Sequence, residues 1–230
     1  MIEVKELHKY FGDLHILKGI TTTIEKGEKV TAMIPISGFE EGTYLTMVTQ
    51  NGVIKRTDIK EYEYQRKGGK IAINLDEGDK LIFVGHTDGE KHILIGTRNG
   101  YAARFHENKV SVVGRTARGV RAISLKEGDE VIGMDIITDD SVILTVSETG
   151  YGRRSPGDEY RQQTRGGKGI IGMATKENDF IEKVIALHSH SYLLMFTNKG
   201  KVQVKKAYQV PEAGRTAKGT KMVNLLELAE

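Results

Sequence analysis

Turn glycines recur along this chain at a nearly constant interval. Gly52, Gly100, Gly150 and Gly200 are separated by 48, 50 and 50 residues, and each lies between an apolar segment and a segment that carries basic residues. A tight glycine turn between two such segments is typical of a β-hairpin. A constant period of this length predicts one supersecondary unit that is repeated about four times and stacked into a ring or solenoid.

A basic, glycine-rich loop follows each hairpin, and these loops are of two kinds that alternate. Residues 65–70 and 163–169 carry a Gly-Gly-Lys core, whereas residues 114–119 and 214–219 begin with Gly-Arg-Thr-Ala. Because roughly 40 to 50 residues per blade is the range of β-propellers, we expect an all-β chain. Its expected architecture is a four-unit β-propeller or β-pinwheel of four-stranded antiparallel blades. The less favoured alternative is a β-sandwich with accidental internal similarity.

Short acidic turns separate successive units, and one of them occurs near the front of the chain at residues 25–28. The repeated part therefore begins there. We expect an N-terminal β-ribbon in residues 1–26 and a repeat domain in residues 27–230. The four units are expected at about residues 27–78, 79–128, 129–176 and 177–230.

The composition narrows the classes of function. The chain contains no cysteine, which excludes a disulfide framework and a thiolate metal site. No apolar segment approaches the roughly 20 residues that span a bilayer, so we expect a cytoplasmic protein without membrane contact. We find no catalytic motif, and we therefore expect no enzymatic activity, no cofactor and no bound metal. The net charge of +3 does not by itself indicate a nucleic-acid partner.

The placement of the charges is more informative than their sum. Glycine pairs flanked by Arg and Lys let the backbone approach a phosphate closely while the cations neutralise it. Four such loops at equivalent positions predict a positive belt that holds a phosphate backbone without reading its sequence. For one loop alone, a tight crossover with solvated cations would be the simpler explanation. Basic residues on the second strand of each hairpin are expected to add to the belt: Lys55, Arg56, Arg104, Arg153, Arg154, Lys205 and Lys206.

The loop at residues 163–169 reads Gln-Thr-Arg-Gly-Gly-Lys-Gly. It resembles the signature box of the C-terminal domain of the DNA gyrase A subunit, or of its topoisomerase IV relative, with Thr164 where arginine is usual. The Gly-Arg-Thr-Ala loops and the sequence Pro-Glu-Ala at residues 211–213 are also similar to that family, and the resemblance covers about residues 27–228. It implies a β-pinwheel whose positive rim binds and bends DNA, with the box needed to wrap DNA in a chiral sense.

The resemblance assigns contact with double-stranded DNA to the box residues Gln163, Arg165, Gly166, Gly167, Lys168 and Gly169. A weaker second copy of the box comprises Gln65, Lys67, Gly68, Gly69 and Lys70, with Ile71 in place of the last glycine. Basic residues of the other loops and of the third hairpin complete the expected contacts: Arg115, Arg118, Arg153, Arg154, Arg215 and Lys218.

The chain departs from that family in three respects. The family's domain usually has more blades, its breakage-reunion domain with the catalytic tyrosine is not found in this sequence, and the units stand in rotated order. Residues 224–230 would continue naturally into residues 27–35, which is the pattern of a circular permutation. A ring whose ends meet tolerates such a permutation.

Residues 2–12 and 17–28 resemble the first hairpin of an ABC transporter ATPase. In that family a phosphate-binding loop follows within about ten residues, but residues 35–42 contain no Gly-Lys-Ser/Thr, so we expect no ATP binding. We expect the segment to form a two-stranded ribbon that closes or caps the ring. Three origins fit this junction: a natural gene fusion, an engineered chimera and a mis-assembled reading frame.

Three functional hypotheses follow. The first is a DNA-binding and DNA-bending module without catalysis of its own, which acts alone or with a topoisomerase core subunit. The second is a protein-interaction module whose basic rim binds an acidic partner. The third is a degenerate, non-functional ABC ATPase/gyrase chimera. Open blade edges would also permit a homodimer.

Overall fold

The computed structural model of the chain describes residues 2–24, 26, 27, 29–64, 69–138, 140–175 and 178–226. Their regular structure consists of sixteen β-strands and five short 3-10 helices, which confirms the expected all-β class. Within these residues no helix is long and apolar enough to cross a membrane. The 3-10 helices are η1 (Ile59–Tyr62), η2 (Glu107–Lys109), η3 (Gly157–Glu159), η4 (Ala207–Gln209) and η5 (Met222–Leu225).

The N-terminal segment forms a separate ribbon. Strand β1 (Ile2–Phe11) pairs antiparallel with β2 (Leu14–Ile24), and no other strand of the described residues joins this sheet. Between the ribbon and the next strand, residues 29–43 contain neither a strand nor a helix. A phosphate-binding loop of the ABC type would lead into a helix at this place. The described residues therefore give no support to an ATPase.

Each turn glycine closes a β-hairpin, which confirms the predicted repeat. The turn is held by the acidic turn of the following unit: the Asp129 carboxylate accepts a hydrogen bond from the Asn99 N–H at 2.9 Å. Asp79 and Asp179 make the same bond to the neighbouring hairpins. The four hairpins are β3–β4 (Tyr44–Thr49 and Val53–Asp58), β6–β7 (His92–Thr97 and Tyr101–His106), β10–β11 (Val142–Ser147 and Tyr151–Pro156) and β14–β15 (Tyr192–Phe196 and Val202–Lys206).

Strands from the following unit complete three of the four hairpins to four-stranded sheets. We call these sheets blade 1 (β5-β3-β4-β8), blade 2 (β9-β6-β7-β12) and blade 3 (β13-β10-β11-β16), and we call β14–β15 the open hairpin. The inner strands follow the acidic turns, and the two-residue outer strands end the basic loops. The inner strands are β5 (Leu81–Thr87), β9 (Val131–Ile137) and β13 (Ile181–Leu187), and the outer strands are β8 (Val120–Arg121), β12 (Ile170–Ile171) and β16 (Thr220–Lys221).

This exchange of strands means that a blade and a predicted unit do not contain the same residues. Blade 1 takes its hairpin from residues 44–58 but its outer strand from residues 120–121, which lie in the second predicted unit. The predicted units are therefore repeats of sequence and not separate sheets. Among the described residues the fourth unit has a two-stranded sheet, so the expectation of four-stranded blades is correct for three units.

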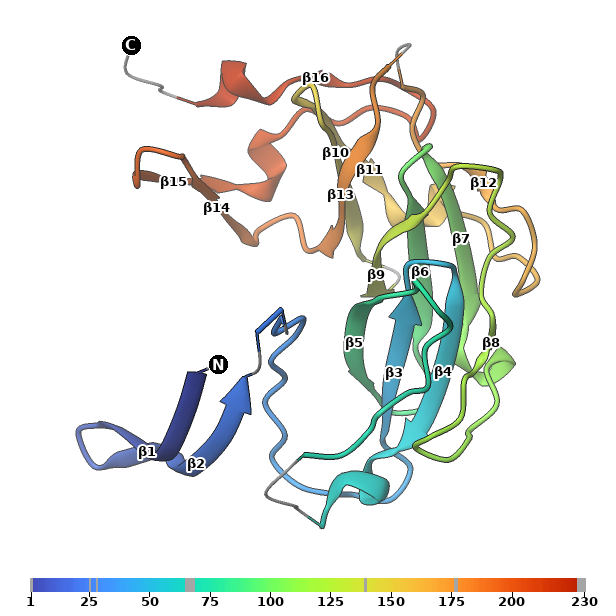
Figure 1. Cartoon of the computed structure of the whole chain (residues 1–230). Helices are drawn as coiled ribbons and strands as arrows, with labels where there is room; N and C mark the ends of the chain where they lie inside the picture. The colour runs from blue at the N-terminus through green and yellow to red at the C-terminus, as the bar shows by residue number, and fades with distance from the viewer. Residues whose placement is uncertain are drawn as a thin grey trace.

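The apolar core lies between the blades. Val48 of blade 1 shares one buried cluster with Ile95 and Met134 of blade 2. In a second cluster Val184 of blade 3 packs against Leu94 of blade 2. Figure 1 shows the consequence: the blades follow an arc with their inner strands side by side, and a gap separates the N-terminal part from the open hairpin.

Candidate nucleic-acid interface

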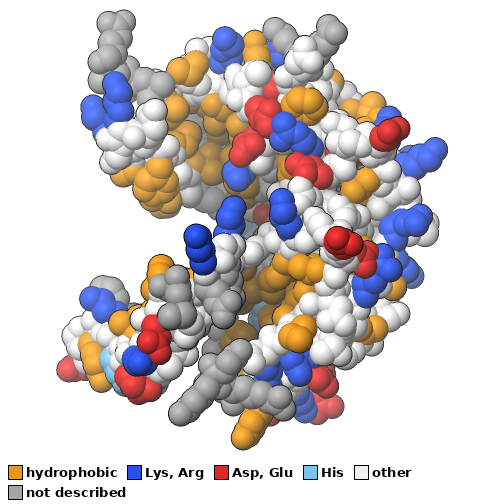
Figure 2. All heavy atoms as spheres, viewed as in Figure 1, with side chains coloured by type: hydrophobic (Ala, Val, Ile, Leu, Met, Phe, Trp, Pro, Cys, Tyr) orange, Lys and Arg blue, Asp and Glu red, His pale blue; other side chains and the backbone are white. Residues whose placement is uncertain are grey.

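The loops at residues 114–119, 163–169 and 214–219 lie along the outer edge of the arc, because each of them runs into the outer strand of the preceding blade. A glycine with positive φ stands immediately before each outer strand, at Gly119, Gly169 and Gly219. A Cβ atom there would lie 2.3 to 2.8 Å from a carbonyl oxygen of the strand that the loop crosses, so only glycine permits the crossing. Figure 2 shows Lys and Arg side chains along the convex edge where Figure 1 places β8 and β12.

Backbone hydrogen bonds to the preceding unit fix the loop at residues 163–169. The Gly166 N–H donates to the carbonyl oxygen of Ala122 at 2.7 Å, and the carbonyl oxygen of Gly167 accepts from Ser124 N–H at 2.8 Å. These backbone groups of the glycine pair are occupied within the protein. The loop therefore presents side chains to a ligand, and the expected backbone contact with a phosphate has no free amide at Gly166.

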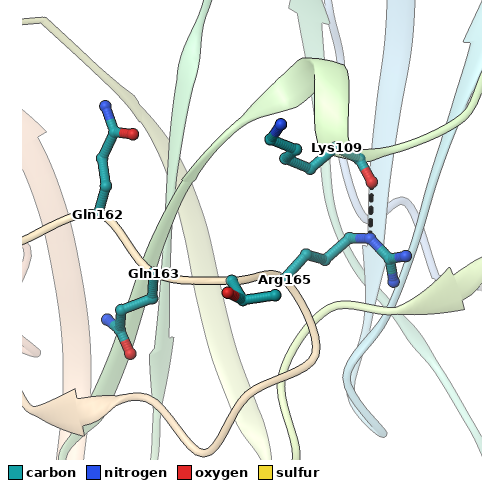
Figure 3. A pocket seen from close by; sticks show the side chains of 5 residues that line it. Lys109, Gln162, Gln163 and Arg165 are labelled. Carbon is teal, nitrogen blue, oxygen red and sulfur yellow. Dashed lines mark hydrogen bonds between the residues drawn. The ribbon is translucent and has the colours of Figure 1, made fainter.

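The two cations of this loop differ in environment. Arg165 is half-buried: its Nε donates to the carbonyl oxygen of Lys109 at 2.7 Å (Figure 3), and its Nη1 donates to that of Arg121. Lys168 is exposed. Arg165 therefore holds the loop against the preceding unit, whereas the Lys168 ammonium group can reach a ligand.

An open pocket of about 550 Å³ lies beside the same loop. It is lined by Lys109 and by the loop residues Gln162, Gln163, Thr164 and Arg165 (Figure 3). The exposed cation Lys109 is not among the predicted DNA contacts, because it stands in η2 and outside any glycine-rich loop. The fixed spacing between η2 and the Gly-Arg-Thr-Ala loop is the signal that could have found it.

The Gly-Arg-Thr-Ala loop of unit two also contains one held and one exposed cation. Arg115 is half-buried, and its Nη1 donates to the carbonyl oxygen of Ile71 at 2.6 Å. Arg118 is exposed and forms an ion pair with Asp76. This pair is open to solvent, where an ion pair contributes about 1 kcal/mol or less. Arg118 is therefore available to exchange Asp76 for another anion.

The equivalent loop of unit four is held more firmly. Arg215 is half-buried, its N–H donates to the Glu159 carboxylate, and its carbonyl oxygen accepts from Arg153. Lys218 is also half-buried, and its Nζ lies 3.7 Å from the centroid of the Tyr151 ring in a cation–π contact. Neither cation of this loop is fully exposed.

The weaker box of unit one is described only in part. Gln65, Lys67 and Gly68 lie outside the described residues. Gly69 is exposed, and Lys70 is half-buried with its Nζ 3.0 Å from a backbone carbonyl oxygen of η1. The role of this copy stays a prediction.

The strand cations are the main correction to the sequence analysis. The prediction that Lys55 and Arg153 extend a surface belt is wrong, because both side chains are 0% exposed. The Nε of Arg153 donates to the carbonyl oxygen of Ala217 at 2.8 Å, and its Nη2 donates to those of Gly172 and Arg215. Arg153 thus ties the residue that follows β12 in its own unit to the Gly-Arg-Thr-Ala loop of the next unit.

Lys55 has the same role in blade 1. Its Nζ lies 2.8 Å from the carbonyl oxygen of Ala72 and 3.1 Å from that of Gly114, and it also donates to that of Arg115. Burial, followed by the nearby Arg115 guanidinium, lowers the pKa of Lys55 to about 8, while Glu61 acts in the opposite direction. Three carbonyl oxygens compensate in part for the burial of this charge.

These interior cations follow the alternation of the loops. Lys55 and Arg153 are each the third residue after the turn glycine, and both belong to units with a Gly-Gly-Lys loop. Ala103 and Gln203 occupy this position in the other two units. The alternation is a sequence signal that could have indicated a structural role for the two cations.

The next position along the same strand carries an arginine in three units, and each of them binds the following unit. Arg56 Nη1 lies 3.2 Å from the buried Glu107 carboxylate, and Arg104 Nη1 donates to a carbonyl oxygen of η3 at 3.1 Å. Arg154 Nη1 lies 2.8 Å from the Glu212 carboxylate. Arg154, which the sequence analysis places among the DNA contacts, is therefore engaged in a joint between units.

Comparison with known families gives a match over most of the chain. The family described as DNA gyrase C-terminal domain, beta-propeller, matches residues 43–88, 91–138, 141–188 and 191–227. These four segments correspond to the four sequence repeats, and they begin after the N-terminal ribbon.

Two curated relatives are DNA gyrase A subunits. That of Halalkalibacterium halodurans is 47% identical over 98 residues, which are 43% of this chain and 12% of the relative. That of Haloquadratum walsbyi is 46% identical over 101 residues, which are 42% of this chain and 12% of the relative. The matched part of the chain thus spans about an eighth of the length of these proteins.

Two solved structures share the fold. The C-terminal domain of DNA topoisomerase IV superposes with a TM-score of 0.80 and 30% identity, over 86% of this chain and 63% of that chain. The DNA gyrase A C-terminal domain superposes with a TM-score of 0.73 and 24% identity, over 81% of this chain and 63% of that chain.

Proposed function

Because this chain belongs to the DNA gyrase C-terminal domain family of β-propellers, we propose that it binds double-stranded DNA without reading the base sequence and bends it along the outer edge of the arc. One observation carries the proposal: the outer strands of three successive blades bring their basic loops to the same convex edge. Cations at regular intervals on a convex edge can neutralise successive phosphates of a duplex that curves along it.

The energy of this binding would come mainly from phosphate neutralisation. Each neutralised phosphate releases condensed counterions, so the logarithm of affinity falls with the logarithm of salt concentration by about 0.9 per phosphate. The contacts available at this edge are flexible ammonium and guanidinium groups, which position a backbone but do not distinguish bases. The proposed binding is therefore strong at low salt and independent of sequence.

The loop cations take two roles in this proposal. Lys168 and Arg118, with the neighbouring Lys109 and Arg121, are exposed and contact phosphates directly. Arg165 acts by positioning the loop. Arg115 and Arg215 also hold their loops in place, and the glycines allow the close crossing of the preceding strand.

The wider assignments rest on the same family. We propose that residues 27–230 are the DNA-binding domain and that residues 1–26 are an added ribbon. The domain would act as an accessory module in the cytoplasm, alone or with a topoisomerase core subunit, because the relatives are gyrase subunits that extend well beyond the matched part. Homodimers through open blade edges belong to the same set of proposals.

A salt series with matched variants tests the DNA contact. Lys168→Gln removes one exposed cation from the outer edge, and Lys183→Gln removes one exposed cation from the inner strand β13. We expect Lys168→Gln to weaken binding to long duplex DNA and to reduce the salt slope by about 1, and Lys183→Gln to change neither. Fluorescence anisotropy at several salt concentrations measures both quantities.

Equal effects of the two variants would contradict a contact at the outer edge. Binding to heparin that matches binding to long DNA would favour an acidic protein partner over DNA. Absence of binding to long duplex at low salt would overturn the proposal.

A topology assay tests chiral wrapping. Nicked plasmid closed by ligase in the presence of the protein is expected to shift in linking number. The double variant Arg165→Ala/Lys168→Ala is expected to lose the shift, because one change frees the loop and the other removes its exposed charge. Binding without any shift would contradict wrapping and leave an edge that only holds DNA.

A further inference from the structure

The open hairpin lacks the neighbours that the other hairpins have. In blades 1 to 3 an inner strand pairs with the first hairpin strand, but β14 pairs with β15 alone among the described residues. Apolar side chains of this hairpin are exposed, with Phe196 at 77% and Val202 at 48%. An unpaired edge beside exposed apolar side chains is a site for association with another strand.

Blade 1, at the other end of the arc, has no hairpin packed against its free face among the described residues. Leu45, Met47, Leu81 and Val84 of blade 1 belong to an apolar cluster against which Ile34 and Phe39 pack, in place of the hairpin that the other blades have there. A pocket of about 430 Å³ opens over this cluster. The corresponding pocket between blades 2 and 3 measures about 10 Å³, because the two blades fill the space with side chains.

The repeat indicates which residues would cover this cluster. The cluster is the counterpart of the part of blade 2 that packs with Val48 and Ile54 of the preceding hairpin. Counted from the turn glycine, Phe196 and Val202 stand at the positions of Val48 and Ile54. The exposed apolar residues of the open hairpin thus match the cluster of blade 1 over which this pocket opens.

Residues 30–36 carry the sequence of an inner strand. Gly-Glu-Lys-Val at residues 27–30 repeats Gly-Asp-Lys-Leu at residues 78–81 and Gly-Asp-Glu-Val at residues 128–131, and each inner strand has seven residues. In the structure this segment lies outside any strand, with Val30 72% and Met33 90% exposed. A strand sequence is therefore present without a partner.

Pro35 fits an inner-strand position. In the register of the other blades it takes the place of Ile136 in β9 and of Ala186 in β13. The N–H groups of both residues donate to the Asp135 carboxylate at 2.8 Å and point away from the hairpin. Proline, which has no N–H, would therefore lose no hydrogen bond of the ladder at this place.

We propose that the chain assembles head to tail, with residues 30–36 of one copy paired to β14 of a second copy and Phe196 packed on the blade 1 cluster. A second copy is the occupant because the arc superposes on part of a longer domain and leaves its two ends without a neighbouring blade among the described residues. The superposition covers only part of the topoisomerase IV domain, and four units with this curvature leave the gap seen in Figures 1 and 2. A heterologous contact of this kind joins the two unlike ends of the arc.

An engineered disulfide tests the register, because the chain has no cysteine of its own. Met33 would stand opposite Met195 in a non-hydrogen-bonded pair, where Cα atoms are about 4.5 Å apart and within reach of a disulfide. Mixing Met33→Cys protein with Met195→Cys protein under mild oxidation is expected to give a covalent dimer. Mixing Met33→Cys with Leu194→Cys is the matched control and is expected to give none, because the Leu194 side chain points to the opposite face.

Two outcomes would overturn the assembly. If the double variant Met33→Cys/Met195→Cys forms a cross-linked monomer, the chain's own segment fills the open hairpin. If light scattering of the unmodified chain gives the monomer mass at every concentration and no cross-link forms, the hairpin stays open. No DNA is present in these measurements, and the inference does not depend on DNA binding, so its failure would leave the proposed function untouched.

Proline substitutions at two neighbouring positions, Ala32 and Met33, add a second test with its own control. The Ala32 N–H would face β14, whereas the Met33 N–H would face away from it, as the position of Pro35 does. Ala32→Pro is expected to weaken assembly about tenfold by removing one ladder hydrogen bond, and Met33→Pro to leave it unchanged. Equal effects of the two prolines would contradict the register.

Discussion

Blade 2 and the open hairpin have the same sequence pattern and opposite environments. Leu94 and Leu194 stand at the same distance before their turn glycines, yet Leu94 is 1% exposed and Leu194 is 57% exposed. Both hairpins pair with the same register, since Leu94 faces Arg104 and Leu194 faces Val204. What blade 2 has in addition is an inner strand, an outer strand and a blade on either side.

The comparison teaches that local sequence determines the hairpin, whereas its neighbours determine whether it is buried. In a repeat array the stability is approximately a sum of unit terms and nearest-neighbour interface terms. The two apolar clusters that join blades 1, 2 and 3 are such interfaces. The open hairpin therefore adds the stability of its own unit but only part of the stability that comes from interfaces with neighbouring units.

Truncating Leu94 and Leu194 gives the largest expected difference in stability between blade 2 and the open hairpin. Leu94→Ala is expected to lower the free energy of unfolding by about 3 kcal/mol, because it leaves a cavity between blades 2 and 3. Leu194→Ala is expected to change it by about 0.5 kcal/mol or less. Urea titrations at low protein concentration measure both values, and similar losses would mean that the hairpin is enclosed in solution.

Replacing Arg153, the interior cation of blade 3, tests the link that it forms between two units. The open hairpin has Gln203 at this position. Arg153→Met leaves the carbonyl oxygens of Ala217, Gly172 and Arg215 without this donor, and we expect a loss of about 2 kcal/mol. Arg153→Lys is the control, because lysine fills the same position in blade 1, and it should lose less. Hydrogen exchange of residues 214–219 should rise in the Met variant, and unchanged exchange would contradict the link.

The smallest expected effect is the pH dependence of stability that Asp135 contributes at the interface of blades 2 and 3. Burial raises the pKa of this carboxyl, which accepts the Ala186 N–H across the interface of blades 2 and 3. The folded state then binds the proton more tightly than the unfolded chain, so its contribution to stability is present at low pH and is lost as pH rises through the folded pKa. Asp135→Asn does not ionise there, so the fall in the urea midpoint with rising pH should be shallower. Parallel curves for the two proteins would contradict this assignment.

The hairpins could be predicted from the sequence because their signals are local. A turn glycine between an apolar and a basic segment contains all that a hairpin needs. The exchange of strands could not be predicted in this way. An outer strand such as β8 has two residues and therefore no periodicity, and it pairs with β4 more than 60 residues earlier in the chain.

The candidate site shows the same limit. The repeated pattern of glycines and basic residues predicts the basic loops. Arg165 and Lys168 stand three residues apart in one loop, however, and only the contacts of Arg165 with Lys109 and Arg121 of another unit separate their roles. The sequence groups Arg153 with the other basic residues of the hairpins and does not show that its side chain points inward. Its partners are carbonyl oxygens of two different loops, which meet only in the folded structure.

Each outer strand is synthesised long after the hairpin that it pairs with, and this order limits when a blade can be completed during translation. The hairpin of blade 1 ends at residue 58, and its outer strand is not made until residues 120–121. At ribosomal rates of about 5 to 20 residues per second, this hairpin waits roughly 3 to 12 s for its last strand. For blade 3 the hairpin ends at residue 156, and its outer strand comes at residues 220–221. A nascent chain of this kind exposes an unfinished edge until that strand is made, and a chain that stops before residue 220 would lack the outer strand of its third blade.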